Sequence, residues 1–189
     1  IFILPFLLFS GYAGHTADVY SKRTVLVVTK VLEIATMGLG FFALLSGHFT
    51  FMLTVLFLLA LQATFFSPAK YGILPELIPH ERLAAANGLL EVWTFAAILT
   101  GTAAGGFLLQ TAGDQTWIAP LALAVLSIAG LVAAFGVPHV SPARTSGGVS
   151  STVRGAWSAI RSEPLLRFAI AGGIFFWMIA SLFAQNVLV

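Results

Sequence analysis

Charged side chains inside apolar stretches are the first residues in this sequence that could do chemistry. Glu33 lies in the apolar run 25–45, three residues after Lys30, and Glu91 follows Asn87 by four residues in another apolar run. Residues three or four apart share a helix face, and ionisable groups at membrane depth face a protein interior or a cavity. Burial favours the protonated form of a carboxyl group, so either glutamate could carry a proton, and Lys30, Glu33, Asn87 and Glu91 are candidate contacts for a polar headgroup or an ion. Structural alternatives stay open: a Lys30–Glu33 ion pair, Lys30 reaching back to the membrane surface, and a neutral Glu91 hydrogen-bonded between helices.

Three uncharged polar residues also fall in apolar stretches, namely Gln62, Gln185 and Asn186. Such side chains are more often hydrogen-bond partners between membrane helices than ligands, and both interpretations are kept for substrate or ion binding. The chain has no cysteine, and no two of its histidines have metal-ligand spacing, so we expect no metal site and no cofactor. No Ser/His/Asp arrangement or phosphate-binding loop occurs, and the few cations do not suggest nucleic-acid binding. The sequence therefore predicts neither an enzyme nor a nucleic-acid-binding protein.

The amino-acid composition indicates whether the chain folds in water or in lipid. The 189 residues are 59% hydrophobic and only 8% charged, with a mean hydropathy of +0.99. Soluble domains carry about 25% charged residues, so this much apolar surface predicts a protein embedded in lipid. The chain begins inside an apolar run, without a charged leader or an initiator methionine. We expect it to be a piece of a longer protein without a signal peptide.

Apolar helices are the elements that would position the polar residues. Full membrane spans are predicted at residues 25–46, 49–66, 84–109, 117–135 and 165–189. Residues 1–13 are too short to span alone and are predicted to be the tail of a helix. Residues 67–82 are predicted to form a polar loop, because Pro68, Pro75 and Pro79 forbid one continuous helix. Residues 136–164, rich in Ser, Gly and Pro, are predicted to form a linker.

The cations of alternate loops predict the orientation of the chain. Eight of the nine Lys and Arg residues fall in loops of one side, which are Lys22, Arg23, Lys70, Arg82, Arg144, Arg154, Arg161 and Arg167. The opposite turns at 47–48 and 111–116 have none, so the cation-bearing loops are predicted to be cytoplasmic. Within the linker, Val153, Ala156, Trp157 and Ile160 fall on one helical face. That pattern predicts an amphipathic helix lying on the membrane surface.

Residues 14–23 form a short polar island between two apolar runs and are predicted to be a tight turn between membrane helices. Gly14 would let the chain leave one helix and let backbones approach closely. Asp18 would accept hydrogen bonds from backbone donors at the start of the next helix. Lys22 and Arg23 would lie at the cytoplasmic surface, as in any positively charged inner loop.

This island resembles the signature loop between helices 2 and 3 of the major facilitator superfamily, through Gly14, Asp18, Ser21, Lys22 and Arg23. The basic residue that usually follows the aspartate is replaced by Val19, and a usual glycine by Ser21. The resemblance implies a gating role, in which the loop latches the two halves of a transporter. The alternative is an ordinary positively charged loop.

The resemblance extends over the whole chain and implies an all-α membrane protein, a major facilitator helical bundle covering part of helix 2 through helix 7. Residues 1–136 would be a partial N-terminal bundle, 137–164 the cytoplasmic central linker with its amphipathic helix, and 165–189 the first helix of the C-terminal bundle. Gly101–Gly106 resembles a degraded glycine-rich antiporter motif without its proline. Close packing of small residues explains these glycines equally well.

Residues 62–79 and 83–91 resemble the region of helices 4 and 5 in the bacterial lysophospholipid transporters, a branch that includes forms fused to an acyltransferase and an acyl-carrier-protein synthetase. The resemblance implies alternating-access movement of lysophosphatidylethanolamine across the bacterial cytoplasmic (inner) membrane, with Lys70 and Arg82 in a loop near lipid phosphates. A fused or separate acyltransferase is an implied partner. Two alternatives stay open: a proton-coupled superfamily exporter of drugs or other small amphiphiles, and a membrane enzyme or scaffold whose catalytic residues lie elsewhere.

Overall fold

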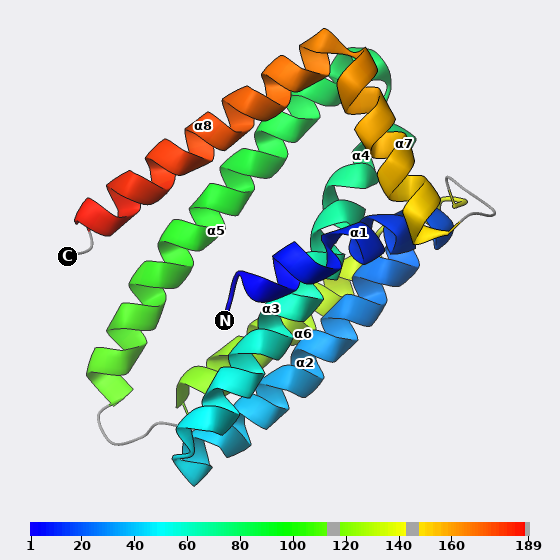
Figure 1. Ribbon diagram of the computed structural model, residues 1–189. Coiled ribbons are helices and arrows are strands. Elements are labelled where there is room, and N and C mark those ends of the chain that lie inside the picture. The colour runs from blue at the N-terminus through cyan, green and yellow to red at the C-terminus, as the bar shows by residue number, and fades with distance from the viewer. Residues whose placement is uncertain (113–117, 143–147, 188–189) are drawn as a thin grey trace. The chain divides into compact units, whose positions relative to one another are not determined.

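The computed structural model describes residues 1–112, 118–142 and 148–187, which contain helices and no strand (Figure 1). The chain divides into two compact units, residues 1–146 and 147–189. The first contains α1 (Leu4–Val19), α2 (Lys22–Ser46), α3 (Phe49–Gly72), α4 (Leu74–Leu77), the 3₁₀ turn η1 (His80–Arg82), α5 (Leu83–Ala112) and α6 (Ile118–Phe135). The second contains α7 (Val149–Ser162) and α8 (Pro164–Val187). The prediction of an all-α protein is confirmed.

The connection between α1 and α2 is shorter than the predicted island. Helix α1 continues to Val19, where the Tyr20 amide still donates to the Thr16 carbonyl at 3.0 Å, so only Tyr20 and Ser21 separate the helices. The prediction of a loop from residue 14 is wrong, because polar residues end a hydrophobic run without ending a helix. Helix α2 starts without a side-chain cap, and Asp18 lies in the last turn of α1, so the capping prediction for Asp18 is wrong as well.

Gly14 was expected to permit a close backbone approach or a helix exit. It lies inside α1, its φ angle is not positive, and a Cβ atom added there would meet nothing within 4 Å. Both physical reasons given for this glycine are therefore wrong. The position instead tolerates a side chain in the described part of the chain.

The predicted loop at 67–82 is largely helical. Pro68 lies inside α3, which continues to Gly72, and the Ile73 amide donates to the Ala69 carbonyl at 3.2 Å. One proline removes a single donor, and the helix resumes around it. Pro75 occupies the first turn of α4, where no amide donor is needed. The segment still breaks at Ile73 and around Pro79, so the prediction that no continuous helix crosses it is correct, whereas its start at residue 67 is wrong.

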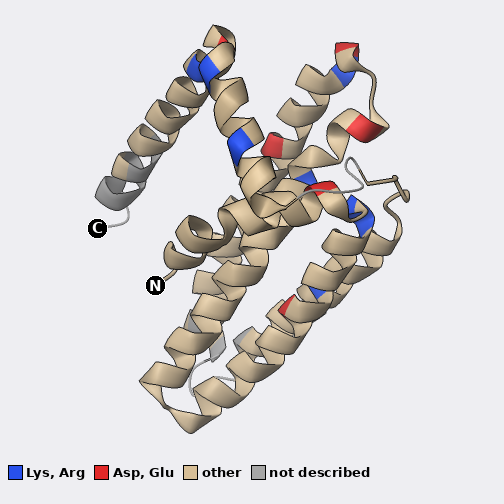
Figure 2. Cartoon of the chain, turned by 45° about the vertical axis from the view of Figure 1, so that its right-hand side comes forward, with Lys and Arg blue, Asp and Glu red and all other residues tan. Residues whose placement is uncertain are grey.

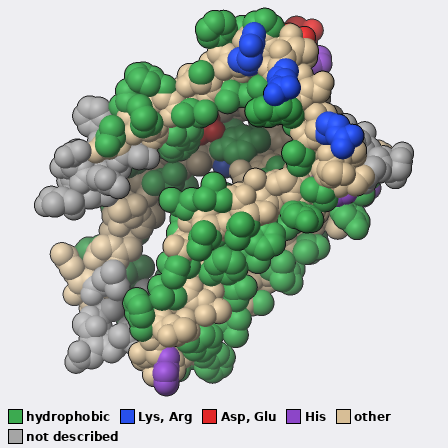
Figure 3. Space-filling view, viewed as in Figure 1, with side chains coloured by type: hydrophobic (Ala, Val, Ile, Leu, Met, Phe, Trp, Pro, Cys, Tyr) green, Lys and Arg blue, Asp and Glu red, His purple; other side chains and the backbone are tan. Residues whose placement is uncertain are grey.

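Small residues bring α1, α2, α3 and α6 together. Ala13, Ala43, Ala60 and Ala69 have 1% exposure or less, and Ala17, Val25, Leu26, Val55, Ile73 and Ala134 are also buried. Small side chains let helix backbones approach closely where lipid supplies no hydrophobic drive. Large apolar side chains such as Leu7 and Phe49 remain exposed, and hydrophobic side chains cover much of the visible face in Figure 3. This arrangement suits a lipid environment.

Within the described residues, three segments are long and apolar enough to cross a membrane: Lys22–Ser46, Phe49–Leu77 and His80–Leu108. Helices α7 and α8 satisfy the same test only as a pair, bent by 102° at their junction, and Pro120–Phe135 is a shorter apolar helix. Figure 2 shows charged residues away from the hairpin between α2 and α3, and residues 34–69 contain no Lys, Arg, Asp or Glu. The chain is a multi-pass membrane protein.

Candidate functional site

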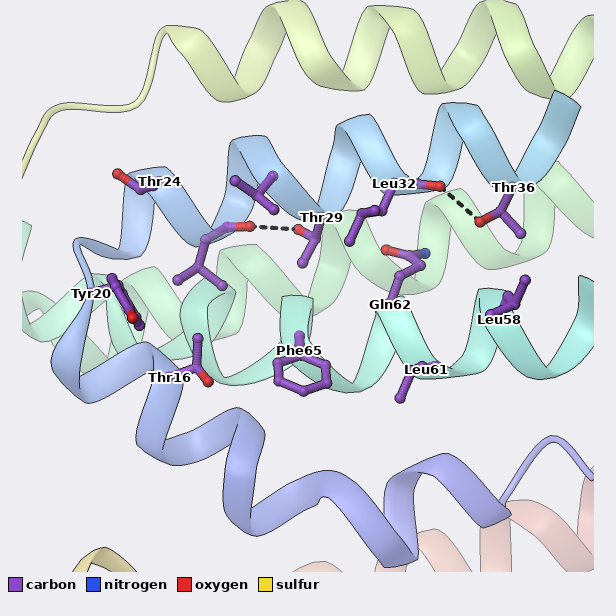
Figure 4. A pocket seen from close by; sticks show the side chains of 12 residues that line it. Thr16, Tyr20, Thr24, Thr29, Leu32, Thr36, Leu58, Leu61, Gln62 and Phe65 are labelled. Carbon is purple, nitrogen blue, oxygen red and sulfur yellow. Dashed lines mark hydrogen bonds between the residues drawn. The ribbon is translucent and has the colours of Figure 1, made fainter. Parts of the chain in front are cut away.

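A cavity of about 500 Å³ lies between α1, α2 and α3 (Figure 4). Its walls are formed by Thr16, Tyr20, Thr24, Val25, Val28, Thr29, Leu32, Thr36, Leu58, Leu61, Gln62 and Phe65. Binding cavities for small molecules span about 300–1,000 Å³. This one is therefore large enough for a ligand or for part of a larger amphiphile.

The cavity wall is apolar apart from a few hydroxyl groups and one amide. The Thr29 hydroxyl donates to the Val25 carbonyl at 2.8 Å, and the Thr36 hydroxyl to the Leu32 carbonyl at 2.8 Å (Figure 4). The hydroxyl groups of both threonines therefore donate to carbonyl groups within α2. Gln62 is different, because its Oε1 atom is buried without a hydrogen-bond partner among the described residues. The cavity thus combines apolar walls with the amide side chain of Gln62, whose oxygen is not exposed on the cavity surface.

The other end of the Gln62 amide belongs to a polar cluster, defined here as Lys30, Glu33, Gln62 and Ser127. Gln62 Nε2 donates to Glu33 Oε2 at 3.2 Å, and Ser127 Oγ donates to Glu33 Oε1 at 2.8 Å. Lys30 Nζ donates to the same two oxygens at 2.9 and 3.1 Å. The Glu33 carboxylate therefore joins α2, α3 and α6 and has donors on both oxygens.

Lys30 lies inside the bundle and does not extend to the surface. Its side chain is 20% exposed and that of Glu33 is 17% exposed. Lys30 Nζ lies 5.1 Å from the centre of the Phe66 ring, a cation–π distance. Gly130 of α6 leaves room for the Lys30 side chain, because a Cβ atom at this position would lie 3.2 Å from Lys30 Cε and 3.3 Å from Lys30 Nζ. Of the structural alternatives for Lys30, the ion pair is observed.

A second group joins α3 to α5. Lys70 Nζ donates to Thr94 Oγ1 at 2.7 Å, and Tyr71 interacts through its hydroxyl group with Glu91. Lys70 lies in the last turn of α3, so its predicted place in a loop is wrong. Asn87 lies one turn before Glu91 on α5 and is exposed, as is Arg82 in η1. The second group is separate from the polar cluster.

Lys22 and Arg23, predicted to be loop cations at the surface, are anchored inside the first unit. Lys22 is 5% exposed and forms an ion pair with Glu76 of α4. Arg23 Nη2 donates to the Phe135 carbonyl at 2.9 Å. A carboxylate from a distant element therefore compensates the charge of Lys22, and the expected place of this residue at the cytoplasmic surface stays a prediction.

Sequence reasoning missed Ser127, Gly130 and Glu76, which complete these contacts. A serine or glycine in an apolar helix is common and gives no signal of its own. Glu76 carries a charge and could have been considered as a partner for Lys22. The side chains of Gln185 and Asn186, and Arg144, lie outside the described residues. Among the described residues, no group of three or more His, Asp or Glu could hold a metal ion.

Comparison with known proteins places these helices in a family. The model of the Major Facilitator Superfamily matches residues 1–188. The chain is 36% identical over 183 residues to a protein of Salmonella gallinarum named lysophospholipid transporter LplT, covering 94% of this chain and 43% of that protein. Proteins of the same name from Photorhabdus laumondii and Escherichia fergusonii are 32% identical over 185 and 183 residues, each match covering 94% of this chain and 44% of the relative.

The chain spans less than half the length of these curated relatives. No solved structure matches it significantly. The family match covers nearly every residue and agrees with the helical membrane architecture. The chain belongs to the Major Facilitator Superfamily.

Proposed function

We propose that the protein containing this chain is a secondary transporter that moves lysophospholipids, chiefly lysophosphatidylethanolamine, across the bacterial cytoplasmic membrane. The observation that carries the proposal is the 32–36% identity, over 94% of the chain, to proteins named lysophospholipid transporter. Transport would proceed by alternating access, in which two helical bundles rock around a central site. An acyltransferase, fused or separate, would then consume the transported lipid.

The cavity between α1, α2 and α3 supports an amphiphilic substrate. Its Val, Leu and Phe side chains suit an acyl chain, and the Gln62 amide would meet a headgroup ammonium or hydroxyl once its buried oxygen turns toward the cavity. A buried acceptor without a partner is costly, so a donor from the substrate would be favoured there. In this proposal Gln62 contacts the substrate, and Lys30 and Glu33 hold Gln62 in position.

Asn87, Glu91, Lys70 and Arg82 form the second candidate region. Lys70 and Glu91 already have partners in α5 and α3, so they would meet a headgroup or a proton only after those contacts open. Asp18, Lys22 and Arg23 would act at the gate. The Lys22–Glu76 pair and the Arg23–Phe135 hydrogen bond hold this end of α2 in the described state.

The test is uptake of radiolabelled lysophosphatidylethanolamine by spheroplasts of a transporter-deficient strain that expresses the full-length protein. Vector alone is the control, with and without an agent that collapses the proton gradient. We expect uptake above vector. A well-expressed protein without uptake would contradict the lipid proposal and favour an exporter of small amphiphiles.

A matched pair of variants tests the cavity itself. Leu61 lines the cavity on α3, and Leu56, on the same helix, does not. Leu61→Trp should fill the cavity and reduce lipid uptake at least tenfold at equal expression, whereas Leu56→Trp should leave uptake near that of the wild type. Equal uptake by both variants would exclude the cavity from the transport path.

A further inference from the structure

The surface of α7 carries a feature that the transport proposal does not use. One face contains Val149, Val153, Ala156, Trp157 and Ile160, and α7 has no buried residue. Val153 is 50% exposed and Trp157 is 57% exposed. An apolar helix face of this kind is unfavourable in water, so it should be covered by another apolar surface.

The angle between α7 and α8 sets the direction of α7 relative to the membrane span that follows it. Helix α7 ends at Ser162, α8 begins at Pro164, and the two axes differ by 102° (Figure 1). Helix α8 has 24 residues, which correspond to about 36 Å at 1.5 Å per residue and exceed the hydrocarbon thickness of about 30 Å. A helix nearly perpendicular to a membrane span lies along the membrane plane.

The charges of α7 lie on the flank beside the apolar face. Arg154 and Arg161 are seven residues apart, and therefore nearly aligned along the helix at 3.6 residues per turn. The Arg161 guanidinium lies 5.1 Å from the centre of the Trp157 ring, and α7 contains no Asp or Glu. A tryptophan at the apolar edge with arginines beside it is the arrangement that fits the boundary between acyl chains and phosphates.

We propose that α7 is a membrane-surface helix that binds anionic phospholipid, with Val153, Trp157 and Ile160 in the acyl region and Arg154 and Arg161 on lipid phosphates. The occupant of the apolar face is lipid, because the span that follows leaves α7 in the membrane plane and the flanking charges are cationic only. This proposal rests on α8 as a span and does not depend on the transported substrate.

The absence of cysteine from the chain allows a direct test. Val153→Cys and Ser158→Cys, on opposite sides of α7, are each spin-labelled in the full-length protein after replacement of any cysteine outside residues 1–189. The protein is reconstituted in phosphatidylcholine alone or mixed with phosphatidylglycerol. Accessibility to oxygen and to a water-soluble nickel chelate then reports the depth of each label.

We expect the label at 153 to be accessible to oxygen and protected from the chelate, with deeper burial when phosphatidylglycerol is present. The label at 158 should meet the chelate. Replacing Arg154 and Arg161 by Gln should abolish the phosphatidylglycerol effect at 153, because each arginine lost should weaken association with anionic lipid about fivefold. Replacing both by Lys should preserve the effect.

Three results would overturn the proposal. Protection of the label at 153 from both reagents would show that protein covers this face. Equal exposure of both labels to the chelate would show that α7 is not on the membrane. If the depth of the label at 153 depended neither on phosphatidylglycerol nor on the arginines, anionic lipid would be excluded as the ligand of α7.

Discussion

Ser127 of α6 donates a hydrogen bond of 2.8 Å to Glu33 of α2, although 94 positions separate the two residues. Glu33 also accepts from Lys30 and from Gln62. Its carboxylate therefore serves as the common acceptor through which α2, α3 and α6 are joined inside an otherwise apolar bundle. Gln62, one of the residues that line the cavity, is held by the same carboxylate.

Ser127→Ala should weaken the bundle without blocking the cavity. Ser127 is 3% exposed, and the variant removes one donor to a charged group, which should lower the unfolding free energy by about 1–2 kcal/mol. Reversible unfolding in detergent measures the change. Ser158→Ala, at an exposed position of α7, is the control and should change stability by less than about 0.5 kcal/mol. Equal effects of the two variants would contradict the role given to Ser127.

The Lys30–Glu33 pair can be tested by a double-mutant cycle. Lys30→Met leaves a partly buried carboxylate without its counter-charge, and Glu33→Gln leaves a partly buried ammonium, so each single variant should lose stability and transport. The double variant should be more stable than the sum of the single changes predicts, by at least about 1 kcal/mol. It should also regain part of the uptake, because the pair holds Gln62 without touching the substrate. A double variant as inactive as the singles, yet stably folded, would place the charges on the substrate.

Gly130 should accept alanine at a small cost and leucine at a large one. An added Cβ would lie 3.2 Å from Lys30 Cε, so the lysine side chain must shift by a few tenths of an ångström against its bonds to Glu33. We expect Gly130→Ala to cost about 1 kcal/mol or less and Gly130→Leu to cost clearly more. Gly38→Ala in α2, where a Cβ meets nothing within 4 Å, should be neutral or slightly stabilising. Thermal unfolding of the three variants gives the order.

Glu76 should contribute strongly to the stability of the protein, although it lies in a helix of only four residues. Glu76→Gln leaves Lys22 buried without its counter-charge, which should cost about 3 kcal/mol. Glu81→Gln makes the same chemical change at an exposed position and should cost less than about 0.5 kcal/mol. If unfolding showed equal losses, Lys22 would have another partner. Replacing both members of the pair by apolar residues should recover most of the loss.

The predicted face of α2 was correct at Lys30 and Glu33, because the i, i+3 spacing is a local property of a helix. Their partners Gln62 and Ser127 could not be assigned, since contacts across 29 and 94 positions depend on which helices pack together. The predicted loops at 14–23 and 67–82 were too long for a related reason. Polarity marks where a helix leaves the membrane, whereas its last turn is set by hydrogen bonds, such as those of Tyr20 to Thr16 and Ile73 to Ala69.

Hydropathy by itself determined that this protein is helical and lies in a membrane, because an apolar run in lipid must satisfy its backbone hydrogen bonds internally. The local motif residues by themselves indicated the superfamily. Only the tertiary structure decided which charges are compensated. It buried Lys22 against Glu76 and surrounded Glu33 with donors from three helices, because a charge in a low-dielectric bundle is stable only where the packing brings it a partner.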